Sequence, residues 1–233
     1  MLELRDVDCF YGKVQALRGL SLQVAAGEVL CLLGRNGAGK TTTLKAVMGL
    51  LRPRSGAIML GDIDLTALPA HEVPRQGVAY VPQGRRLFAE LTARENLEIG
   101  LMTRRTGEET LERVLGLFPV LRERLRQRAG TLSGGEQQML AMARALCIEP
   151  RIMLLDEPTE GLMPSMIAKI RDSVIALKGE GVATILVEQR VDAVLPVADR
   201  VAFLETGRLR AVMSVAELRE DPSLLRRYVG VGD

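Results

Sequence analysis

The sequence is poor in histidine, aromatic residues and cysteine. It has one histidine, no tryptophan, four phenylalanines and three tyrosines among 233 residues. Cys9, Cys31 and Cys147 are odd in number and widely spaced among apolar neighbours. That pattern excludes a disulfide framework and a metal site built from paired cysteines, and it indicates reduced core thiols in a cytosolic protein.

The sequence also lacks strong net charge and long apolar runs. A formal charge of +2 provides no clearly basic face, so nucleic acid is not an expected partner. No apolar run approaches the roughly 20 residues that span a bilayer. The first ten residues, "MLELRDVDCF", lack the basic-then-apolar pattern of a signal peptide. A role at a membrane would therefore depend on a partner.

What is present is a regular alternation of apolar strands and helices. The stretches "EVLCLLG", "GVAYVPQ", "IMLLDEP" and "ATILVEQ" predict buried strands, and helical patterns such as "PSMIAKIRDSVIALKGEG" lie between them. Continuous apolar strands that alternate with helices indicate a parallel sheet covered on both faces. The alternating patterns "LELRDVDCFYG" and "LSLQVAAGE" predict half-buried strands of an antiparallel edge. The fold class is therefore α/β.

The middle of the chain has a different pattern. From about residue 91 to 150 no strand-like run occurs, and four helices are predicted within "TARENLEIGLM", "EETLERVLGLF", "VLRERLRQR" and "GGEQQMLAMARALC". We expect one nucleotide-binding domain, with an α/β core and antiparallel edge over 1–83 and 151–213. A helical subdomain would be inserted at 84–150, and two short helices would lie in 214–233.

The segment "GRNGAGKT", Gly34–Thr41, fits the phosphate-loop pattern G-x-x-x-x-G-K-[ST] between a strand and a helix. Backbone N–H groups and a helix N-terminus converge there and favour an anion. The ammonium of Lys40 is expected to reach the β- and γ-phosphates, and the hydroxyl of Thr41 to ligate Mg²⁺. The alternative, a glycine-rich turn without function, is disfavoured because pattern and context agree. The expected nucleotide-binding residues are Gly34, Arg35, Asn36, Gly37, Ala38, Gly39, Lys40, Thr41 and Thr42.

Two adjacent acids follow the strand in "RIMLLDEP". Asp156 fits the carboxylate that holds Mg²⁺ in phosphate-loop enzymes, directly or through water. Glu157 lies one residue farther and is expected to polarise the attacking water. Acids at a strand end are often only solvated, but the phosphate loop in the same chain favours the catalytic interpretation.

A second candidate anion site opens the helix in "TLSGGEQQMLAMARAL". Ser133, Gly134, Gly135 and Glu136 stand at the helix start, where backbone N–H groups are free to bind an anion. One nucleotide does not need two such cradles from a single domain. A head-to-tail pair of chains, with each ATP held between the two cradles, explains both. A simple helix cap is the alternative.

These motifs, together with "VPQG" and "LLDEPT", resemble the nucleotide-binding subunit of an ABC transporter over essentially the whole chain. The resemblance implies a RecA-like phosphate-loop NTPase core that binds ATP and Mg²⁺. It implies that Tyr11 stacks on adenine. It also implies that the side chain of Gln83 approaches Mg²⁺ while its loop contacts a membrane partner, so that Thr41, Gln83 and Asp156 are the candidate metal ligands.

Further stretches resemble importers for branched-chain and other hydrophobic amino acids: "RPRSG", "DLTALPAHE", "YVPQGRRLF", "LTARENLEIG" and "LETGRL". Urea and short-amide importers share nearly all of them, and "CLLGRNG" and "DEPTEG" favour that type. The resemblance implies an ATP-driven motor at the cytoplasmic face of the cell membrane, paired with itself or a homologous ATP-binding subunit. It would be held by two permease subunits and would serve a periplasmic solute-binding protein indirectly.

The sequence departs from the general ABC pattern at two places. After "DEPT" most members continue Ser-Ala-Leu-Asp, whereas this chain has Glu160, Gly161, Leu162 and Met163; whether Glu160 replaces the contact of the absent aspartate is open. Gln189, in "ILVEQ", stands where most members have a histidine that reaches the γ-phosphate. An amide donates a hydrogen bond but exchanges no proton near neutral pH. Gln189 would therefore orient the phosphate, which leaves Glu157 to polarise the water, with Lys40 as the third catalytic residue.

Other features have simpler interpretations. His71 lies between prolines, away from the phosphate motifs, "LRERLRQR" is expected to be a solvated helix face, and Met139 and Met142 are expected in the core. Two other function classes are disfavoured. A soluble ABC ATPase that acts on DNA or ribosomes would carry long coiled coils, or two cassettes joined by a charged linker, and the sequence has neither. A phosphate-loop kinase or GTPase-type switch would leave "LSGGEQQ" without a purpose, and the base-reading N-K-x-D pattern is missing.

Overall fold

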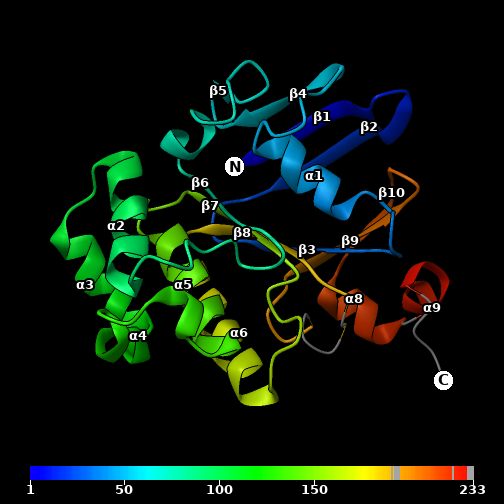
Figure 1. Cartoon of the computed structure of the whole chain (residues 1–233). Coiled ribbons are helices and arrows are strands. Elements are labelled where there is room, and N and C mark those ends of the chain that lie inside the picture. The colour runs from blue at the N-terminus through cyan, green and yellow to red at the C-terminus, as the bar shows by residue number, and fades with distance from the viewer. Residues whose placement is uncertain (190, 192–194, 222, 230–233) are drawn as a thin grey trace.

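A computed structural model describes residues 1–189, 191, 195–221 and 223–229 of the chain. Its centre is a six-stranded sheet in the order β10-β9-β3-β8-β7-β6 (Figure 1). All neighbouring pairs are parallel except β9 with β10. The strands are β3 (Val29–Leu33), β6 (Val78–Val81), β7 (Ile152–Asp156), β8 (Ala183–Val187), β9 (Arg200–Glu205) and β10 (Arg208–Ser214).

A second sheet is antiparallel and has the strand order β2-β1-β4-β5. Its strands are β1 (Leu2–Tyr11), β2 (Val14–Val24), β4 (Ser55–Leu60) and β5 (Ile63–Asp64). Helix α1 (Lys40–Val47) follows β3, and the 3-10 turn η1 (Val73–Gln76) precedes β6. Figure 1 shows α1 between the two sheets, so the helix that follows the phosphate loop is enclosed from both sides.

The remaining helices lie on the other side of the central sheet or near its end (Figure 1). Between β6 and β7 the chain forms α2 (Ala93–Arg104), α3 (Glu108–Leu117), α4 (Pro119–Arg124), the 3-10 turn η2 (Ala129–Thr131) and α5 (Gly134–Leu146). Helix α6 (Pro164–Gly179) connects β7 to β8, and α8 (Val215–Glu220) and α9 (Ser223–Val229) close the described chain. In the described residues, no helix combines the length and apolar character that a membrane crossing needs.

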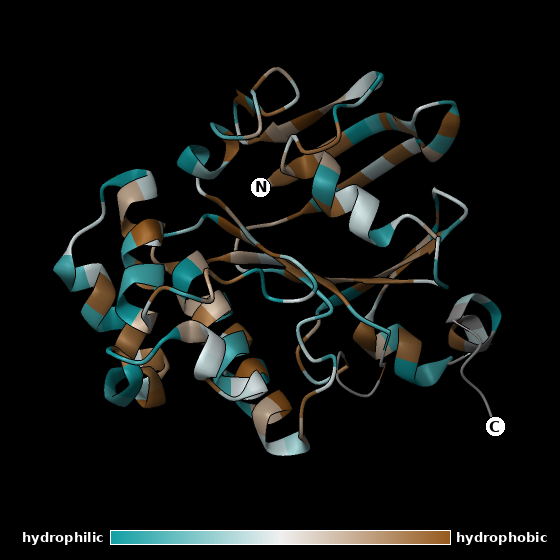
Figure 2. Ribbon diagram, in the orientation of Figure 1, coloured by the Kyte–Doolittle hydropathy of each residue, from teal (hydrophilic) through white to brown (hydrophobic). Residues whose placement is uncertain are grey.

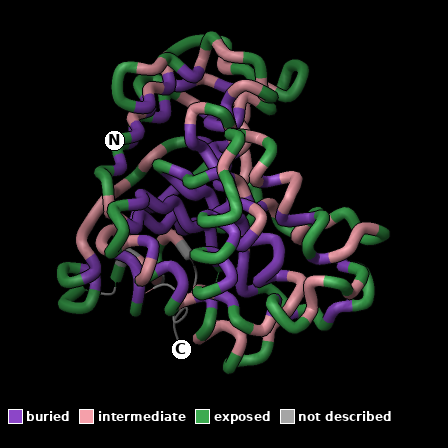
Figure 3. Tube along the Cα trace, turned by 90° about the vertical axis from the view of Figure 1, so that its left-hand side faces the viewer, coloured by how far each residue is buried: buried purple, intermediate pink, exposed green. Residues whose placement is uncertain are grey.

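Each face of the central sheet contacts its own hydrophobic cluster. In β3, Cys31 and Leu33 belong to the cluster that includes α2–α6, whereas Leu30 and Leu32 belong to the cluster that includes α1 and the antiparallel sheet. Figure 2 shows the apolar colour running along the strands of the sheet, and Figure 3 shows those strands as the most buried part of the trace. This two-sided burial explains why the strands have continuous apolar sequences.

The structure confirms the predicted α/β class with a parallel sheet and an antiparallel sheet. Helix α4 is shorter than "VLRERLRQR" suggested, because it ends at Arg124. The backbone N–H groups of Ala93 and Arg94 bond to the carbonyls of Gln127 and Leu125, and residue 128 pairs with Thr92 as an isolated bridge. These bonds hold residues 125–128 in a turn followed by the bridge at residue 128, beside the start of α2. Strands β9 and β10 were not predicted.

Candidate functional site

The phosphate loop lies between β3 and α1. Gly39, the residue before α1, has φ 110°, which favours glycine, and no side chain caps the helix. The first N–H groups of α1 therefore lack a side-chain partner and remain available to an anion. Arg35 and Asn36 are exposed, whereas Ala38, Gly39 and Lys40 are buried. The loop thus presents backbone donors next to a buried ammonium.

Lys40 is folded over its own loop. Its Nζ donates to the carbonyl oxygens of Gly34 at 2.7 Å and of Arg35 at 3.2 Å. Burial lowers the pKa of its ammonium, while the nearby carboxylates of Glu157 and Asp156 act in the opposite direction. An ammonium held only by neutral carbonyls in a buried loop can exchange them for phosphate oxygens, which are stronger acceptors.

Asp156, at the end of β7, is held by two hydroxyl groups. Thr41 Oγ1 donates to Asp156 Oδ1 at 3.0 Å, and Tyr80 Oη donates to Oδ2 at 3.2 Å. Asp156 is 1% exposed, and burial raises its pKa whereas the two hydroxyl bonds lower it. The structure therefore joins Thr41 and Asp156, as expected, and adds Tyr80, which the sequence analysis missed. The signal that could have indicated this contact was a tyrosine in the predicted strand "GVAYVPQ", next to the strand that ends in Asp156.

Glu157 lies between two glutamine side chains. Gln189 Nε2 donates to Glu157 Oε1 at 2.7 Å, and Gln83 Nε2 donates to Oε2 at 3.1 Å. Gln83 Nε2 also donates to Glu160 Oε2 at 2.9 Å. The structure thus brings Gln83, Glu157 and Gln189 together, and it places the unexpected Glu160 beside them. Glu157 has φ 50°, a left-handed conformation that is strained for a residue with a side chain and is typical of functional sites.

The second anion site is a complete helix cap. Ser133 Oγ accepts from the N–H of Glu136 at 3.3 Å, and Glu136 Oε2 accepts from the N–H of Ser133 at 2.9 Å. Glu136 also accepts from Arg124 Nε at 3.1 Å, so its carboxylate is already occupied by the cap and the ion pair. The Ser133 hydroxyl also bonds to the Glu136 side chain and lowers the pKa of that carboxyl; a phosphate oxygen is an alternative acceptor for the same hydroxyl.

The short loop that follows Gln83 contacts the helix that begins at this cap. Gly84, Arg85 and Arg86 have φ values of 77°, 65° and 50°, so three consecutive residues are left-handed. Arg85 reaches α5, where its NH1 donates to Gln137 Oε1 at 3.0 Å. The loop that carries Gln83 is therefore tied to the first turn of α5, a contact that the sequence analysis did not predict.

The two candidate anion sites lie on opposite faces of the central sheet. Leu44 and Val47 of α1 pack in the cluster with the antiparallel sheet, whereas Met139 and Met142 of α5 pack in the cluster on the other face, as the separation of α1 and α5 in Figure 1 also shows. Met139 and Met142 are thus core residues, as expected. The two cradles thus begin helices that pack on different faces of the sheet.

Tyr11 and His71 make none of the hydrogen bonds described above for the phosphate loop, Asp156 and Glu157. Tyr11 ends β1 with 47% of its surface exposed, which leaves its ring free to stack on a base. The imidazole of His71 is exposed and lies 3.4 Å from Glu72 just before η1. The hydrogen bonds of Glu157, Gln83 and Asp156 described above do not include His71.

The oxygen atoms near Asp156 suit Mg²⁺ but do not form a closed cage. No group of three His, Cys, Asp or Glu residues that could hold a metal occurs in the part of the chain that the structure describes. Thr41 and Asp156 supply a hydroxyl and a carboxylate at one point, whereas the Gln83 side chain bonds through its Nε2 to Glu157 and Glu160. Mg²⁺ typically takes one or two such ligands together with substrate phosphates and water, so these residues fit the ion when a nucleotide is bound.

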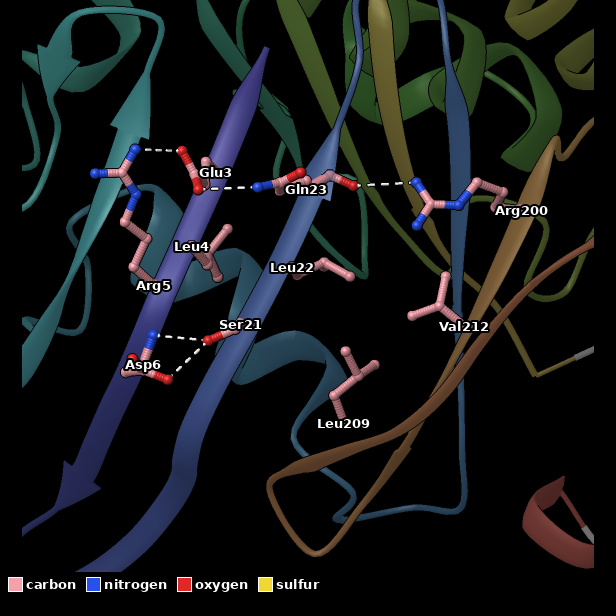
Figure 4. A pocket seen from close by; sticks show the side chains of 10 residues that line it. All are labelled: Glu3, Leu4, Arg5, Asp6, Ser21, Leu22, Gln23, Arg200, Leu209 and Val212. Atoms are coloured by element: carbon pink, nitrogen blue, oxygen red, sulfur yellow. Dashed lines mark hydrogen bonds and ion pairs between the residues drawn. The ribbon is translucent and has the colours of Figure 1, made fainter.

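A groove of about 420 Å³ lies elsewhere, between β1, β2 and the β9–β10 hairpin (Figure 4). Its polar residues already bond to one another: Gln23 donates to Glu3 at 2.9 Å, and Ser21 donates to Asp6 at 2.9 Å. Arg200 at its edge pairs with Glu28 at 2.8 Å. The groove therefore has no polar group aimed into it that waits for a ligand, and it is not the functional site.

Comparison with known proteins agrees with this geometry. A model of the ABC transporter family matches residues 17–160. The chain is 43% identical to the high-affinity branched-chain amino acid transport ATP-binding protein BraG of Pseudomonas aeruginosa, over 99% of this chain and all of BraG. It is 35% identical to the lipopolysaccharide export system ATP-binding protein LptB of Acidithiobacillus ferridurans, over 99% of this chain and 97% of LptB.

A solved structure shares the fold. It is a dimeric ATP-binding cassette in a post-hydrolysis state with ADP and phosphate bound, and it superposes with a TM-score of 0.83 at 26% identity over 92% of this chain and 99% of that chain. The family model covers residues 17–160, and the sequence and fold likenesses extend over nearly the full length. The chain belongs to the ABC transporter family and is an ATP-binding subunit that hydrolyses ATP.

Proposed function

We propose that this chain is the ATP-hydrolysing motor of an ABC importer for branched-chain amino acids, and that it works at the cytoplasmic face of the membrane. The observation that carries this proposal is the full-length likeness to BraG at 43% identity. Uptake of urea or short amides is the alternative that the sequence patterns leave, and the 35% identity to LptB makes export an outcome to be tested.

Two chains pair head to tail, and each ATP lies between the phosphate loop of one copy and Ser133–Gly135 of the other. This proposal is supported by the opposite placement of α1 and α5 in one chain and by the dimeric state of the ADP-bound cassette. ATP bridges the two copies and closes the pair. Loss of the γ-phosphate removes the bridge, so the equilibrium returns to the open state.

Within each site the residues have separate roles. Lys40 leaves the carbonyls of its loop and binds the β- and γ-phosphates. Thr41 and Asp156 hold Mg²⁺, which neutralises phosphate charge when it is bound. Glu157 polarises the attacking water, and Gln189 donates to the γ-phosphate or to Glu157 but carries no exchangeable proton near neutral pH.

The membrane subunits dock on the groove between the core and α2–α5. A cavity of about 290 Å³ lies there, and Tyr80, Pro82, Ile99 and Arg144 are among its lining residues. Phe88, at the loop beside it, is 51% exposed. Buried Asn96 fixes this loop, because it accepts from the N–H of Phe88 and donates to its carbonyl, both at 3.0 Å. An exposed aromatic ring on a fixed loop is typical of a binding hot spot.

Mixing two inactive variants tests the shared sites. Lys40→Ala disables the phosphate loop of a chain, and Ser133→Ala disables the cradle it offers to its partner. A mixed dimer of the two contains one site with both defects and one site with neither. We expect each variant alone to be inactive and the mixture to recover ATP hydrolysis, measured as phosphate release. If the mixture stays as inactive as either variant, the composite site is excluded.

The solute is tested with the intact transporter. We expect the tagged chain to co-purify with two hydrophobic permease subunits, and the reconstituted complex to take up labelled leucine, isoleucine or valine when ATP is supplied. Uptake of labelled urea instead would replace the amino-acid proposal with the amide alternative. Recovery of ribosomes or DNA, with no membrane subunit, would contradict a transport role.

A further inference from the structure

Glu188 is a buried carboxylate for which the proposed chemistry has no direct use. It follows β8 and precedes Gln189, and it is 3% exposed. A carboxylate is seldom buried unless hydrogen bonds compensate for its lost hydration. Burial raises its pKa, whereas hydrogen bonds from Thr159 lower it. The question is what those bonds hold in place.

Besides a backbone hydrogen bond with Gln189, the Glu188 carboxylate accepts two bonds from one residue of the turn that follows Glu157. The N–H of Thr159 donates to Glu188 Oε1 at 3.0 Å, and Thr159 Oγ1 donates to the same oxygen at 2.7 Å. Thr159 is itself buried, at 7% exposure. Because Glu188 Oε1 is occupied in this way and its side chain is shielded, its effect reaches the nucleotide through Thr159.

The same strand end also holds the start of that turn. The N–H of Glu157 donates to the carbonyl of Val187 at 2.9 Å, and the N–H of Glu160 donates back to the carbonyl of Glu157 at 3.2 Å. The turn is thus fixed at two points. Val187 holds the N–H of Glu157, and Glu188 holds Thr159, two residues farther along the chain. Glu157 lies between these anchors with φ 50°, a conformation that persists only where the surroundings enforce it.

The residue after the second anchor is Gln189, whose amide donates to Glu157 at 2.7 Å. Residues 187–189 therefore supply two anchors for the turn and one direct contact to the carboxylate. A shift of Thr159 would move Glu157 relative to Gln189 and relative to an attacking water. The bound phosphates would remain on Lys40 and the phosphate loop.

We propose that Glu188 is a positioning residue for ATP hydrolysis, which clamps Thr159 and so holds the Glu157 carboxylate in its working orientation. The inference rests on the proposed role of Glu157. It assigns to Glu188 no contact with nucleotide or metal. Loss of the clamp would therefore slow hydrolysis while ATP binding and closure of the two copies continue.

The test compares Glu188→Ala, Glu188→Gln and Thr159→Val. The first leaves two buried donors of Thr159 without an acceptor. The second keeps an oxygen that can accept both bonds, and the third removes only the hydroxyl bond while it preserves the side-chain shape. Glu220→Ala, an exposed glutamate of α8, is the control. Glu157→Gln is included as the reference for a chain that binds ATP but hydrolyses it slowly.

For Glu188→Ala we expect kcat to fall by about 100-fold, the effect typical of a 1 Å displacement of a catalytic group, while KM for ATP changes by less than about twofold. Thr159→Val should show a smaller loss, and Glu188→Gln should retain most activity. With Mg²⁺ and ATP, Glu188→Ala should accumulate the closed dimer on size exclusion as Glu157→Gln does. A purely structural role would instead weaken nucleotide binding and yield less dimer.

Three outcomes separate the possibilities. If Glu188→Ala hydrolyses ATP as fast as Glu220→Ala while Glu157→Gln is slow, the positioning role is excluded and the proposed function stands. If Glu188→Ala is slow but yields no ATP-bound dimer where Glu157→Gln does, the positioning role is also excluded. If Glu157→Gln hydrolyses ATP at the parent rate, the proposed role of Glu157 fails, and the inference fails with it.

Discussion

Gln189 Nε2 donates to Glu157 Oε1 across 2.7 Å. A second amide, that of Gln83, occupies the other oxygen of the same carboxylate at 3.1 Å. Both neighbours can donate and neither can exchange a proton near neutral pH. The carboxylate is therefore the only proton acceptor among these three residues, and the glutamines fix its orientation.

Glu157→Gln should bind ATP and close the dimer but hydrolyse ATP slowly. A general base contributes about 10²- to 10⁴-fold to the rate, and an amide replaces it with similar shape but no basicity. Phosphate release and the dimer fraction on size exclusion with ATP measure the two effects. Glu220→Ala is the matched exposed control. Hydrolysis at the parent rate would show that another group activates the water.

The hydrolysis rate should show no titration step at about pH 6.5, where a histidine side chain typically titrates. The reason is that Gln189 has no titratable proton, and the side chains that donate to the Glu157 carboxylate in the described chain are those of Gln83 and Gln189. Gln189→His should retain hydrolysis and should introduce such a step. Initial rates between pH 5.5 and 8.5 measure it.

His71 provides the control for that profile. It lies in the turn before η1 with an exposed imidazole. His71→Ala should leave both profiles unchanged. A step in the parent enzyme that disappears in His71→Ala would show that this imidazole influences hydrolysis and would contradict its placement outside the site.

Phe88→Ala should uncouple the subunit from its membrane partners. The ring is 51% exposed on a loop fixed by Asn96, so its removal deletes contact area without disturbing the core. Loss of an aromatic hot spot costs about 2 kcal/mol or more of binding. We expect reduced co-purification with the permease and unchanged hydrolysis by the isolated chain. Ile175→Ala, which removes an exposed apolar side chain of α6, should change neither.

The three thiols should be unreactive in the folded protein. All are buried, and burial raises the pKa of Cys9 to about 11 and that of Cys147 to about 12. Because the thiolate is the reactive form, a pKa of about 11 leaves roughly one thiol in a thousand ionised at pH 8. Ellman's reagent should react slowly with native protein and with all three thiols in denaturant. Rapid reaction of the native chain would show that one of these thiols is accessible.

The phosphate loop was predictable because its pattern is local. Gly34–Thr41 lie within one strand–loop–helix unit, and the spacing itself implies converging N–H groups. The capping box of Ser133 and Glu136 is equally local. The meeting of Asp156 with Thr41 followed from the convergence of parallel strand ends, which the α/β pattern indicated.

Contacts between distant segments were not predictable in the same way. Tyr80 and Asp156 are 76 residues apart, and Thr159 and Glu188 are 29 apart. Only the strand order β8-β7-β6 brings these pairs together, and a single sequence does not specify that order. Residues 125–128 were assigned to a helix for a similar reason, since the carbonyls of Leu125 and Gln127 accept from Arg94 and Ala93 at the start of α2.

The loop of three left-handed residues after Gln83 has an energetic consequence. Arg85 and Arg86 each carry a conformation that costs roughly 1–2 kcal/mol for a residue with a side chain. Return of both to ordinary backbone angles would release about 2–4 kcal/mol, which corresponds to roughly a 30- to 1,000-fold change in an equilibrium constant. This loop lies between Gln83, beside Glu157, and Phe88, beside the proposed permease groove. Strain of that size is enough to couple permease binding to nucleotide binding. Each ligand would then change the affinity for the other by the same factor.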